Sequence, residues 1–201
     1  MQTCLFLGDS ITDAGHLFDP ANLGNGYVAL LARQTQLKDC AFYNRGHDGF
    51  TIEQIWRMLN RDGIENSWNV ITLLAGVNDI PVEVYTQHQR IPVEFTGYYE
   101  KILCFLKEKT HAKLILVEPF LFDSPQEYQA WHPYIETESK IIRQLAEKYN
   151  ACFLPTDQIL RSAAQTRGVD QITLDGIHLT PVGNQILADL WISAYKKIRL
   201  F

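Results

Sequence analysis

The chain has 201 residues, of which 46% are hydrophobic and 20% charged, and its formal net charge at pH 7 is −5. These proportions are typical of soluble globular proteins and exclude disordered and fibrous classes. The length favours a single domain over residues 1–201. The acidic balance, with lysine and arginine scattered along the chain, argues against nucleic acid and anionic membrane as partners.

The amino-terminal apolar run has no basic start and ends at Gly8, far short of a membrane-spanning length. We therefore expect a cytoplasmic protein without stable membrane association. The four cysteines are widely spaced and lack the Cys-x-x-Cys pairing of zinc and redox sites. They are interpreted as reduced thiols and no metal is expected: Cys4, Cys40, Cys104 and Cys152.

Short apolar runs alternate with longer segments in which apolar residues recur at steps of three and four. The short runs predict strands at 3–7, 41–44, 70–75, 113–118 and 152–155. The longer segments predict amphipathic helices at 27–37, 52–59, 95–107 and 135–149, and a last helix that starts at Pro181 after a Thr180 cap. This alternation is typical of an α/β fold with a parallel sheet. The irregular segment 120–132 is interpreted as a loop over a site.

Ligands of parallel sheets bind at the carboxyl ends of the strands, so the residues that follow each predicted strand are the first candidates for a functional site. Ser10 follows the first strand and can act as a nucleophile, although Ser10-x-x-Asp13 also fits a capping box. The second strand is followed by a glycine-rich turn, 44–51, which either directs backbone N–H groups toward a ligand or only precedes a helix.

Two further strand-end motifs complete the set. Asn78 offers a neutral amide to a developing negative charge, or forms an ordinary Asn-Asp turn. Asp175 and His178 are spaced so that a carboxylate can orient an imidazole, or belong to a common Asp-Gly turn. Each motif alone has a structural explanation, but together they supply a nucleophile, oxyanion donors and a base at one rim, which favours a serine hydrolase.

The motifs Gly-Asp-Ser, Asn-x-Gly-x-x-Gly-x-Thr, Gly-x-Asn-Asp and Asp-x-x-His, which span Gly8 to His178, resemble the four blocks of the SGNH/GDSL hydrolase family. The resemblance implies a three-layer α/β/α sandwich of flavodoxin-like order with a five-stranded parallel sheet. It also implies that the protein needs neither a metal nor an organic cofactor.

On this basis we expect Ser10, Asp175 and His178 to form the catalytic triad of an esterase that works through an acyl-serine intermediate. The oxyanion hole is expected to consist of the backbone N–H groups of Ser10 and Gly46 and the side-chain amide of Asn78.

Residues 8–15 and 23–28 and the Glu-Pro-Phe at 118–120 are similar to the family branch that contains acetylxylan and other carbohydrate acetylesterases. This implies a small-molecule ester as substrate, with acetyl groups on sugars such as xylo-oligosaccharides preferred. His47 and Asp48 stand where small or apolar residues are frequent, and His16 where arginine is frequent, which leaves the polarity of the pocket open. Members of this branch often self-associate, so the chain is compatible with a homo-oligomer.

Two carboxylates, Asp9 and Asp79, flank the catalytic positions and are interpreted as braces that hold the loops through backbone hydrogen bonds. Hydrophobic residues next to the rim are expected to line the acyl or sugar pocket. These residues are Phe50, Ile80, Phe120, Trp131 and Ile177.

Alternatives stay open at this point. A lysophospholipase or acyl-thioesterase would use the same triad on another ester. A catalytically silent sugar-binding protein on an inherited hydrolase fold is an alternative of a different class. Gly24-x-Gly26-x-x-Ala29 superficially matches the dinucleotide fingerprint, but it does not directly follow a predicted strand and is therefore disfavoured.

Overall fold

The computed structural model describes residues 1–86 and 89–199. Five strands form one parallel sheet in the order β2-β1-β3-β4-β5. The strands are β1 (Gln2–Gly8), β2 (Cys40–Gly46), β3 (Val70–Leu74), β4 (Lys113–Val117) and β5 (Cys152–Leu154). Every predicted strand is confirmed, as is the three-layer α/β/α fold.

Eight α-helices and several 3-10 turns connect or follow the strands within the described part of the chain. The helices are α1 (Ser10–Asp13), α2 (Tyr27–Ala32), α3 (Ile52–Asp62), α4 (Asp79–Thr86), α5 (Val93–Lys109), α6 (His132–Lys148), α7 (Asp157–Arg167) and α8 (Pro181–Arg199). The helix predicted at 27–37 stops at Ala32 and is followed by a 3-10 turn at Thr35–Leu37. The segment expected to be irregular, 120–132, contains a 3-10 helix at Gln126–Trp131.

Helices α4 and α7 were not predicted. Pro81 lies in the first turn of α4, where a proline is tolerated because the N–H that it lacks would have no partner within the helix. In α7 only Leu160 and Ala164 are buried, too few to give a clear helical period.

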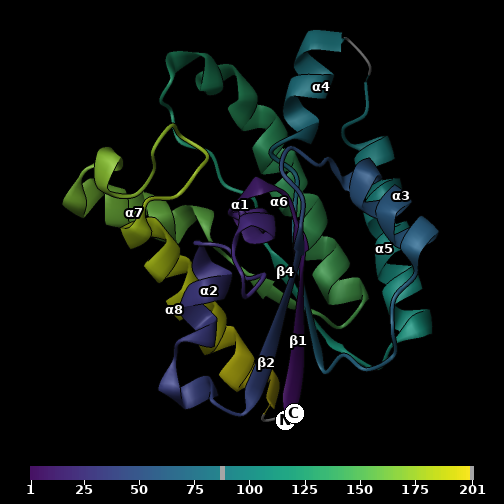
Figure 1. The fold of residues 1–201 in the computed structure, drawn as a ribbon. Coiled ribbons are helices and arrows are strands. Elements are labelled where there is room, and N and C mark those ends of the chain that lie inside the picture. The colour runs from purple at the N-terminus through teal and green to yellow at the C-terminus, as the bar shows by residue number, and fades with distance from the viewer. Residues whose placement is uncertain (87–88, 200–201) are drawn as a thin grey trace.

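The sheet lies between two helical layers (Figure 1), with α2, α7 and α8 on one face and α3, α5 and α6 on the other. Successive residues of β1 point to opposite faces. Leu5 and Leu7 therefore pack with the second layer, while Cys4 and Phe6 pack with the first. The inner strands β3 and β4 are covered on both faces and read as nearly continuous apolar runs, whereas the edge strand β2 is only partly buried.

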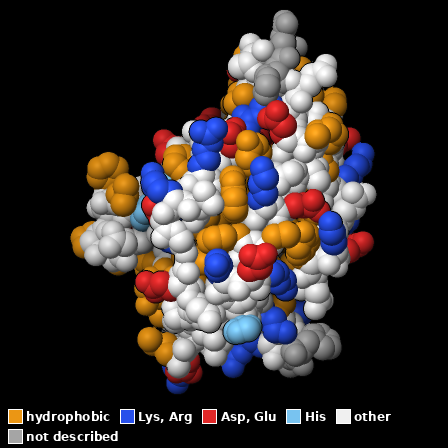
Figure 2. Space-filling model, turned by 90° about the vertical axis from the view of Figure 1, so that its right-hand side faces the viewer, with side chains coloured by type: hydrophobic (Ala, Val, Ile, Leu, Met, Phe, Trp, Pro, Cys, Tyr) orange, Lys and Arg blue, Asp and Glu red, His pale blue; other side chains and the backbone are white. Residues whose placement is uncertain are grey.

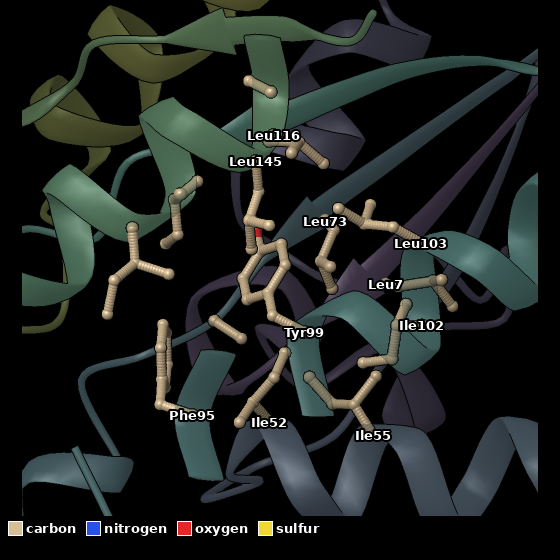
Figure 3. Packing of buried hydrophobic residues seen from close by; sticks show 14 of the residues in the cluster. Leu7, Ile52, Ile55, Leu73, Phe95, Tyr99, Ile102, Leu103, Leu116 and Leu145 are labelled. Carbon is tan, nitrogen blue, oxygen red and sulfur yellow. The ribbon is translucent and has the colours of Figure 1, made fainter. Parts of the chain in front are cut away.

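Each layer has its own hydrophobic core. Figure 3 shows Tyr99 of α5 among leucines of the sheet and helices in the core beneath α3, α5 and α6. In the other core the ring of Trp191 lies 5.4 Å from that of Phe6, and its Nε1 donates to Thr72 Oγ1 at 2.8 Å. A buried polar atom of that core is thus satisfied, as native packing requires.

On the outer face over α3 and α5, side chains of both charge signs are mixed with hydrophobic ones (Figure 2). No helix within the described ranges is long and apolar enough to span a membrane.

The strand order creates a switch point at β1. The chain passes from β1 to β2 on one side, and then returns to place β3 on the other side. Crossovers that leave in opposite directions open a crevice at the carboxyl end of the strand between them. Ser10 begins the helix that directly follows β1, so the fold places it at the carboxyl end of the strand where the order reverses.

Candidate active site

The turn between β1 and α1 presents Ser10. A Cβ atom on Gly8 would lie 2.5 Å from the Leu74 carbonyl oxygen, so the close approach to β3 requires glycine there. Asp9 is the N-cap of α1, and its Oδ1 accepts from the N–H of Ile11 at 3.0 Å. The capping-box alternative for Ser10 is therefore wrong, because Asp9 performs the capping. The Ser10 hydroxyl is left available for other contacts.

The Ser10 hydroxyl meets a histidine from the other end of the chain. Ser10 Oγ lies 2.9 Å from His178 Nε2, and His178 Nδ1 lies 2.6 Å from Asp175 Oδ2. A carboxylate can only accept, so Nδ1 donates to it and Nε2 is left as the acceptor facing Ser10. The three side chains thus form the hydrogen-bonded chain that an activated serine requires.

Asp175 is held as a carboxylate by its own turn. Its Oδ1 accepts from the backbone N–H groups of Ile177 at 3.0 Å and His178 at 2.8 Å. Partial burial acts to raise the pKa of Asp175, but the hydrogen bonds from the imidazole and from these backbone groups outweigh it, and the pKa is lowered. Asp175 therefore stays ionised and orients the imidazole.

The segment expected to form a loop over a site packs against the turn that carries Asp175 and His178. The N–H of Phe122 donates to the Gly176 carbonyl at 2.9 Å. Gly176 has φ +95, and a Cβ atom on it would collide with the Ser124 carbonyl oxygen. Glycine is therefore required on both steric and conformational grounds.

Asn78 follows β3 and is half-buried. Its Nδ2 donates to the Phe50 carbonyl oxygen at 3.2 Å. An amide group carries two N–H bonds, so one remains for a ligand. The Ser10 backbone N–H has no hydrogen-bond partner in the described part of the chain. Both groups are thus available as oxyanion donors.

Gly46, the third expected oxyanion donor, is placed differently. It is buried, and its N–H donates to Asn44 Oδ1 at 2.9 Å. A Cβ atom there would collide with the backbone of Asp13, so Gly46 allows the end of β2 to approach α1. Gly49 in the same loop is exposed, and its N–H lacks a partner among the described residues. The signal for Gly49 was present as the second glycine of the same motif.

A network of side chains braces the loop around Gly49. Asp13 Oδ1 accepts from His16 Nδ1 at 2.8 Å, and its Oδ2 accepts from the Asp48 N–H at 2.9 Å. The His47 ring stacks on Phe50 with centroids 4.6 Å apart. Burial and the neighbouring His16 lower the pKa of His47. Asp13 therefore joins α1 to the loop through the Asp48 N–H, a role that the sequence analysis missed.

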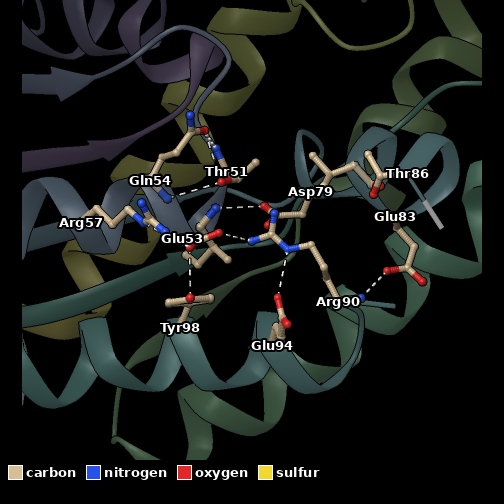
Figure 4. Close-up of polar contacts among 12 residues, drawn as sticks. Thr51, Glu53, Gln54, Arg57, Asp79, Glu83, Thr86, Arg90, Glu94 and Tyr98 are labelled. Atoms are coloured by element: carbon tan, nitrogen blue, oxygen red, sulfur yellow. Dashed lines mark hydrogen bonds and ion pairs between the residues drawn. The ribbon is translucent and has the colours of Figure 1, made fainter. Parts of the chain in front are cut away.

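Asp9 and Asp79 are each 1% exposed and lie next to the catalytic positions. Asp79 Oδ2 accepts from the Ile52 N–H at 2.9 Å, near the Arg90–Glu53 ion pair shown in Figure 4. Burial raises the pKa of each carboxyl group to about 7. Their interpretation as braces is confirmed, because each holds a backbone N–H.

The hydrophobic residues expected to line a pocket divide into two groups. Ile80 and Phe120 are 0% and 1% exposed and belong to the cores, and Trp131 is 5% exposed. These residues offer almost no surface to a ligand, so their placement in the pocket is corrected. Phe50 and Ile177 are only partly buried and remain at the rim.

The glycines of the dinucleotide-like motif have a structural explanation. A Cβ atom on Gly24 would lie 2.6 Å from the Asp13 carbonyl oxygen, and one on Gly26 2.8 Å from the Ala14 Cβ. The two glycines therefore let this segment pack closely on α1. Gly26 caps α2, which follows a loop and not a strand.

Comparison with known proteins shows that this chain is similar to a hydrolase family over nearly its whole length. The model of the GDSL-like lipase/acylhydrolase family matches residues 6–186. An acetylxylan esterase from Geobacillus stearothermophilus is 25% identical over 199 residues, which cover 93% of this chain and 90% of that protein.

Solved structures show the same fold. A GDSL-like lipase from Parabacteroides merdae superposes with a TM-score of 0.87 at 27% identity, over 96% of this chain and 94% of its own. The structure of the Geobacillus stearothermophilus acetylxylan esterase has a TM-score of 0.81 at 22% identity, over 96% and 93% of the two chains. This chain belongs to the GDSL-like lipase/acylhydrolase family and is a serine hydrolase of carboxylic esters.

Proposed function

We propose that this esterase removes acetyl groups from carbohydrates such as xylo-oligosaccharides. The observation that carries the reaction is the hydrogen-bonded chain from Ser10 through His178 to Asp175. The substrate class is supported by the likeness to an acetylxylan esterase over 93% of the chain. Two structures of that esterase are described as catalytic mutants. One has an aspartate replaced by alanine, and the other has alanine in place of a histidine that lies three positions after this aspartate. The same spacing separates Asp175 from His178.

The geometry of Ser10, His178 and Asp175 supports a step in acyl transfer for each side chain. His178 Nε2 takes the Ser10 proton as Oγ attacks the ester carbonyl carbon, and Asp175 stabilises the resulting imidazolium. The tetrahedral intermediate collapses when His178 protonates the leaving alcohol, which leaves an acyl-serine. Water then attacks the acyl carbon and gives a proton to His178, which returns it to Ser10 Oγ as the bond from that oxygen to the acyl carbon breaks; the acid and the free serine are released.

The negative charge of the tetrahedral oxygen needs donors that are already in place. We assign this role to the Ser10 N–H and the free N–H of the Asn78 amide. For the third donor, the exposed Gly49 N–H fits better than the expected Gly46 N–H, which is buried and already donates to Asn44. The hydrogen bond from Asn78 to the Phe50 carbonyl keeps the Gly49 loop beside Asn78.

The Asn78→Ala variant is expected to lower kcat about 100-fold to 1,000-fold, because one preorganised oxyanion donor is lost. The KM for a short ester should change little, since the donor acts mainly on the transition state. Steady-state kinetics with 4-nitrophenyl acetate measures both quantities. Asn66→Ala, at an exposed asparagine before β3, is the matched control and should retain wild-type kinetics. Full activity in Asn78→Ala would remove this side chain from the mechanism.

The esterase is expected to prefer acetate among 4-nitrophenyl esters from acetate to decanoate. A long acyl chain needs an apolar surface, and Ile80 and Phe120 are buried in the cores while Phe50 and Ile177 keep only part of their surface. We therefore expect kcat/KM to fall as the chain lengthens, and acetate to be released from acetylated xylo-oligosaccharides. A maximum at octanoate or decanoate would instead favour the lysophospholipase or acyl-thioesterase alternative.

A further inference from the structure

A third acidic side chain, Glu138 of α6, lies beneath the proposed catalytic residues. It is completely buried, and neither carboxyl oxygen has a hydrogen-bond partner in the described part of the protein. An ionised carboxylate without a partner is very costly to bury, whereas a neutral carboxylic acid is much less so. The burial of Glu138 therefore requires an explanation that the mechanism so far does not provide.

The surroundings of Glu138 favour its neutral form. The titratable groups that face it are Asp9 before α1, Asp79 at the start of α4 and Tyr99 of α5, and the cation Arg90 faces Asp79. Asp9 and Asp79 each accept a backbone N–H, which stabilises a carboxylate. Glu138 accepts none, and the Tyr99 hydroxyl also lacks a partner among the described groups. Of the three acids, Glu138 is thus the one that holds its proton most tightly.

Glu138 lies against the turn that leads to Asn78, the proposed oxyanion donor. Gly76, two residues before Asn78, has φ +147, and a Cβ atom on it would lie 2.6 Å from Glu138 Oε2. The carboxyl group therefore sits against the backbone of the turn that carries Asn78. A side chain larger than hydrogen at position 76 would displace either the turn or the glutamate.

We infer that Glu138 is a positioning residue, whose neutral carboxyl group supports the turn 76–79 and keeps a third negative charge away from the oxyanion. The inference rests on the proposed role of Asn78 as an oxyanion donor. Burial, followed by the charges of Asp79 and Asp9, raises the pKa of Glu138 well above its usual value, in agreement with this placement. Ionisation of Glu138 would add repulsion to the charge that develops in the transition state.

Two substitutions separate the charge of Glu138 from its shape. Glu138→Gln keeps the size and is always neutral, so its kcat for 4-nitrophenyl acetate should stay close to the wild-type value. At alkaline pH its kcat should equal or exceed that of the wild type, which alone can acquire the third charge. Glu138→Ala removes the support, and should lower kcat about tenfold, the equivalent of one pKa unit of interaction energy, with little change in KM.

The exposed Glu147 at the end of α6 provides a matched control, Glu147→Gln, which should behave as the wild type. Folding of each variant is checked by near-ultraviolet circular dichroism. The inference is overturned if folded Glu138→Gln is as impaired as Glu138→Ala, because the carboxylate charge would then be required. Unchanged kcat in folded Glu138→Ala would equally overturn it, since the turn would not depend on this side chain.

A spectroscopic measurement tests the proton without reference to activity. Infrared spectra of protein labelled with ¹³C at the glutamate carboxyl groups should show the C=O stretch of a protonated glutamic acid at pH 7. The band should persist in Ser10→Ala and disappear in Glu138→Gln. Its absence from the wild-type protein would overturn the inference even if Glu138→Gln fails to fold. Because the label is independent of turnover, this result stands whether or not the proposed roles of Ser10 and Asn78 hold.

Discussion

Replacement of Ser10 by alanine is expected to lower kcat by about 10⁶-fold, because the nucleophile and its proton are both lost. The Ser10 Oγ lies 2.9 Å from His178 Nε2 at the end of β1. Without this oxygen no acyl-serine can form, so the pre-steady-state burst of 4-nitrophenol should disappear. Stopped-flow measurement with 4-nitrophenyl acetate detects the burst directly.

Covalent labelling gives an independent test of the same residue. A fluorophosphonate should modify the wild-type enzyme on the peptide that contains Ser10, as identified by mass spectrometry, and should not modify Ser10→Ala. The exposed Ser162 of α7 provides the matched control, because Ser162→Ala should keep both the burst and the label. A label on another residue, or a burst that survives in Ser10→Ala, would show that the nucleophile lies elsewhere.

The Asp175→Asn variant is expected to lower kcat by about 10⁴-fold while the fold is preserved. An asparagine oxygen can still accept the backbone N–H groups of Ile177 and His178 that Asp175 Oδ1 accepts now. The amide nitrogen then faces His178 Nδ1, which favours the tautomer with the proton on Nε2. That nitrogen can no longer accept the proton of Ser10, and the positive charge of the imidazolium loses its partner.

The pH dependence of kcat sharpens this prediction. The lowered pKa of Asp175 means that it stays a carboxylate through the pH range in which an aspartate is ordinarily protonated, so protonation of Asp175 should not set the acidic limb of the wild-type profile. Asp170→Asn, at an exposed aspartate on the approach to the same turn, should leave kcat and its pH profile unchanged. If Asp175→Asn retained a tenth or more of the wild-type kcat, the carboxylate would have no essential part in orienting the base.

The strands could be predicted from the sequence because a parallel sheet is covered by helices on both faces. Ile71 and Leu73 of β3 face one core, and Val70 and Leu74 face the other, so the run is apolar except for Thr72 and stands out in the sequence. The helix α4 lacked such a signal, since only Asp79 and Ile80 are buried in it. Periodicity thus predicts elements that cover a core and fails for those that lie at its edge.

The loop that contains Gly49, our proposed oxyanion donor, shows that a local motif can fail to identify which residue has a given role. The sequence predicted Gly46 as the backbone oxyanion donor after the second strand, although the same motif also contains Gly49. Only the packed structure distinguishes them, because Gly46 is buried with its N–H on Asn44 and Gly49 is exposed. The choice depends on the approach of α1 to β2, a contact between segments more than thirty residues apart.

The sequence alone determined the strands of the sheet and the family resemblance, and it predicted Ser10, Asn78, Asp175 and His178 as site residues from residue type and position beside a strand or turn. Only the tertiary structure decided that Ser10 Oγ meets His178 Nε2, that Ile80 and Phe120 belong to the cores, and that Glu138 lies buried beneath Gly76. Periodicity and motifs are local properties of the chain. Burial and hydrogen bonding depend on which distant segments pack together, and no single segment encodes them.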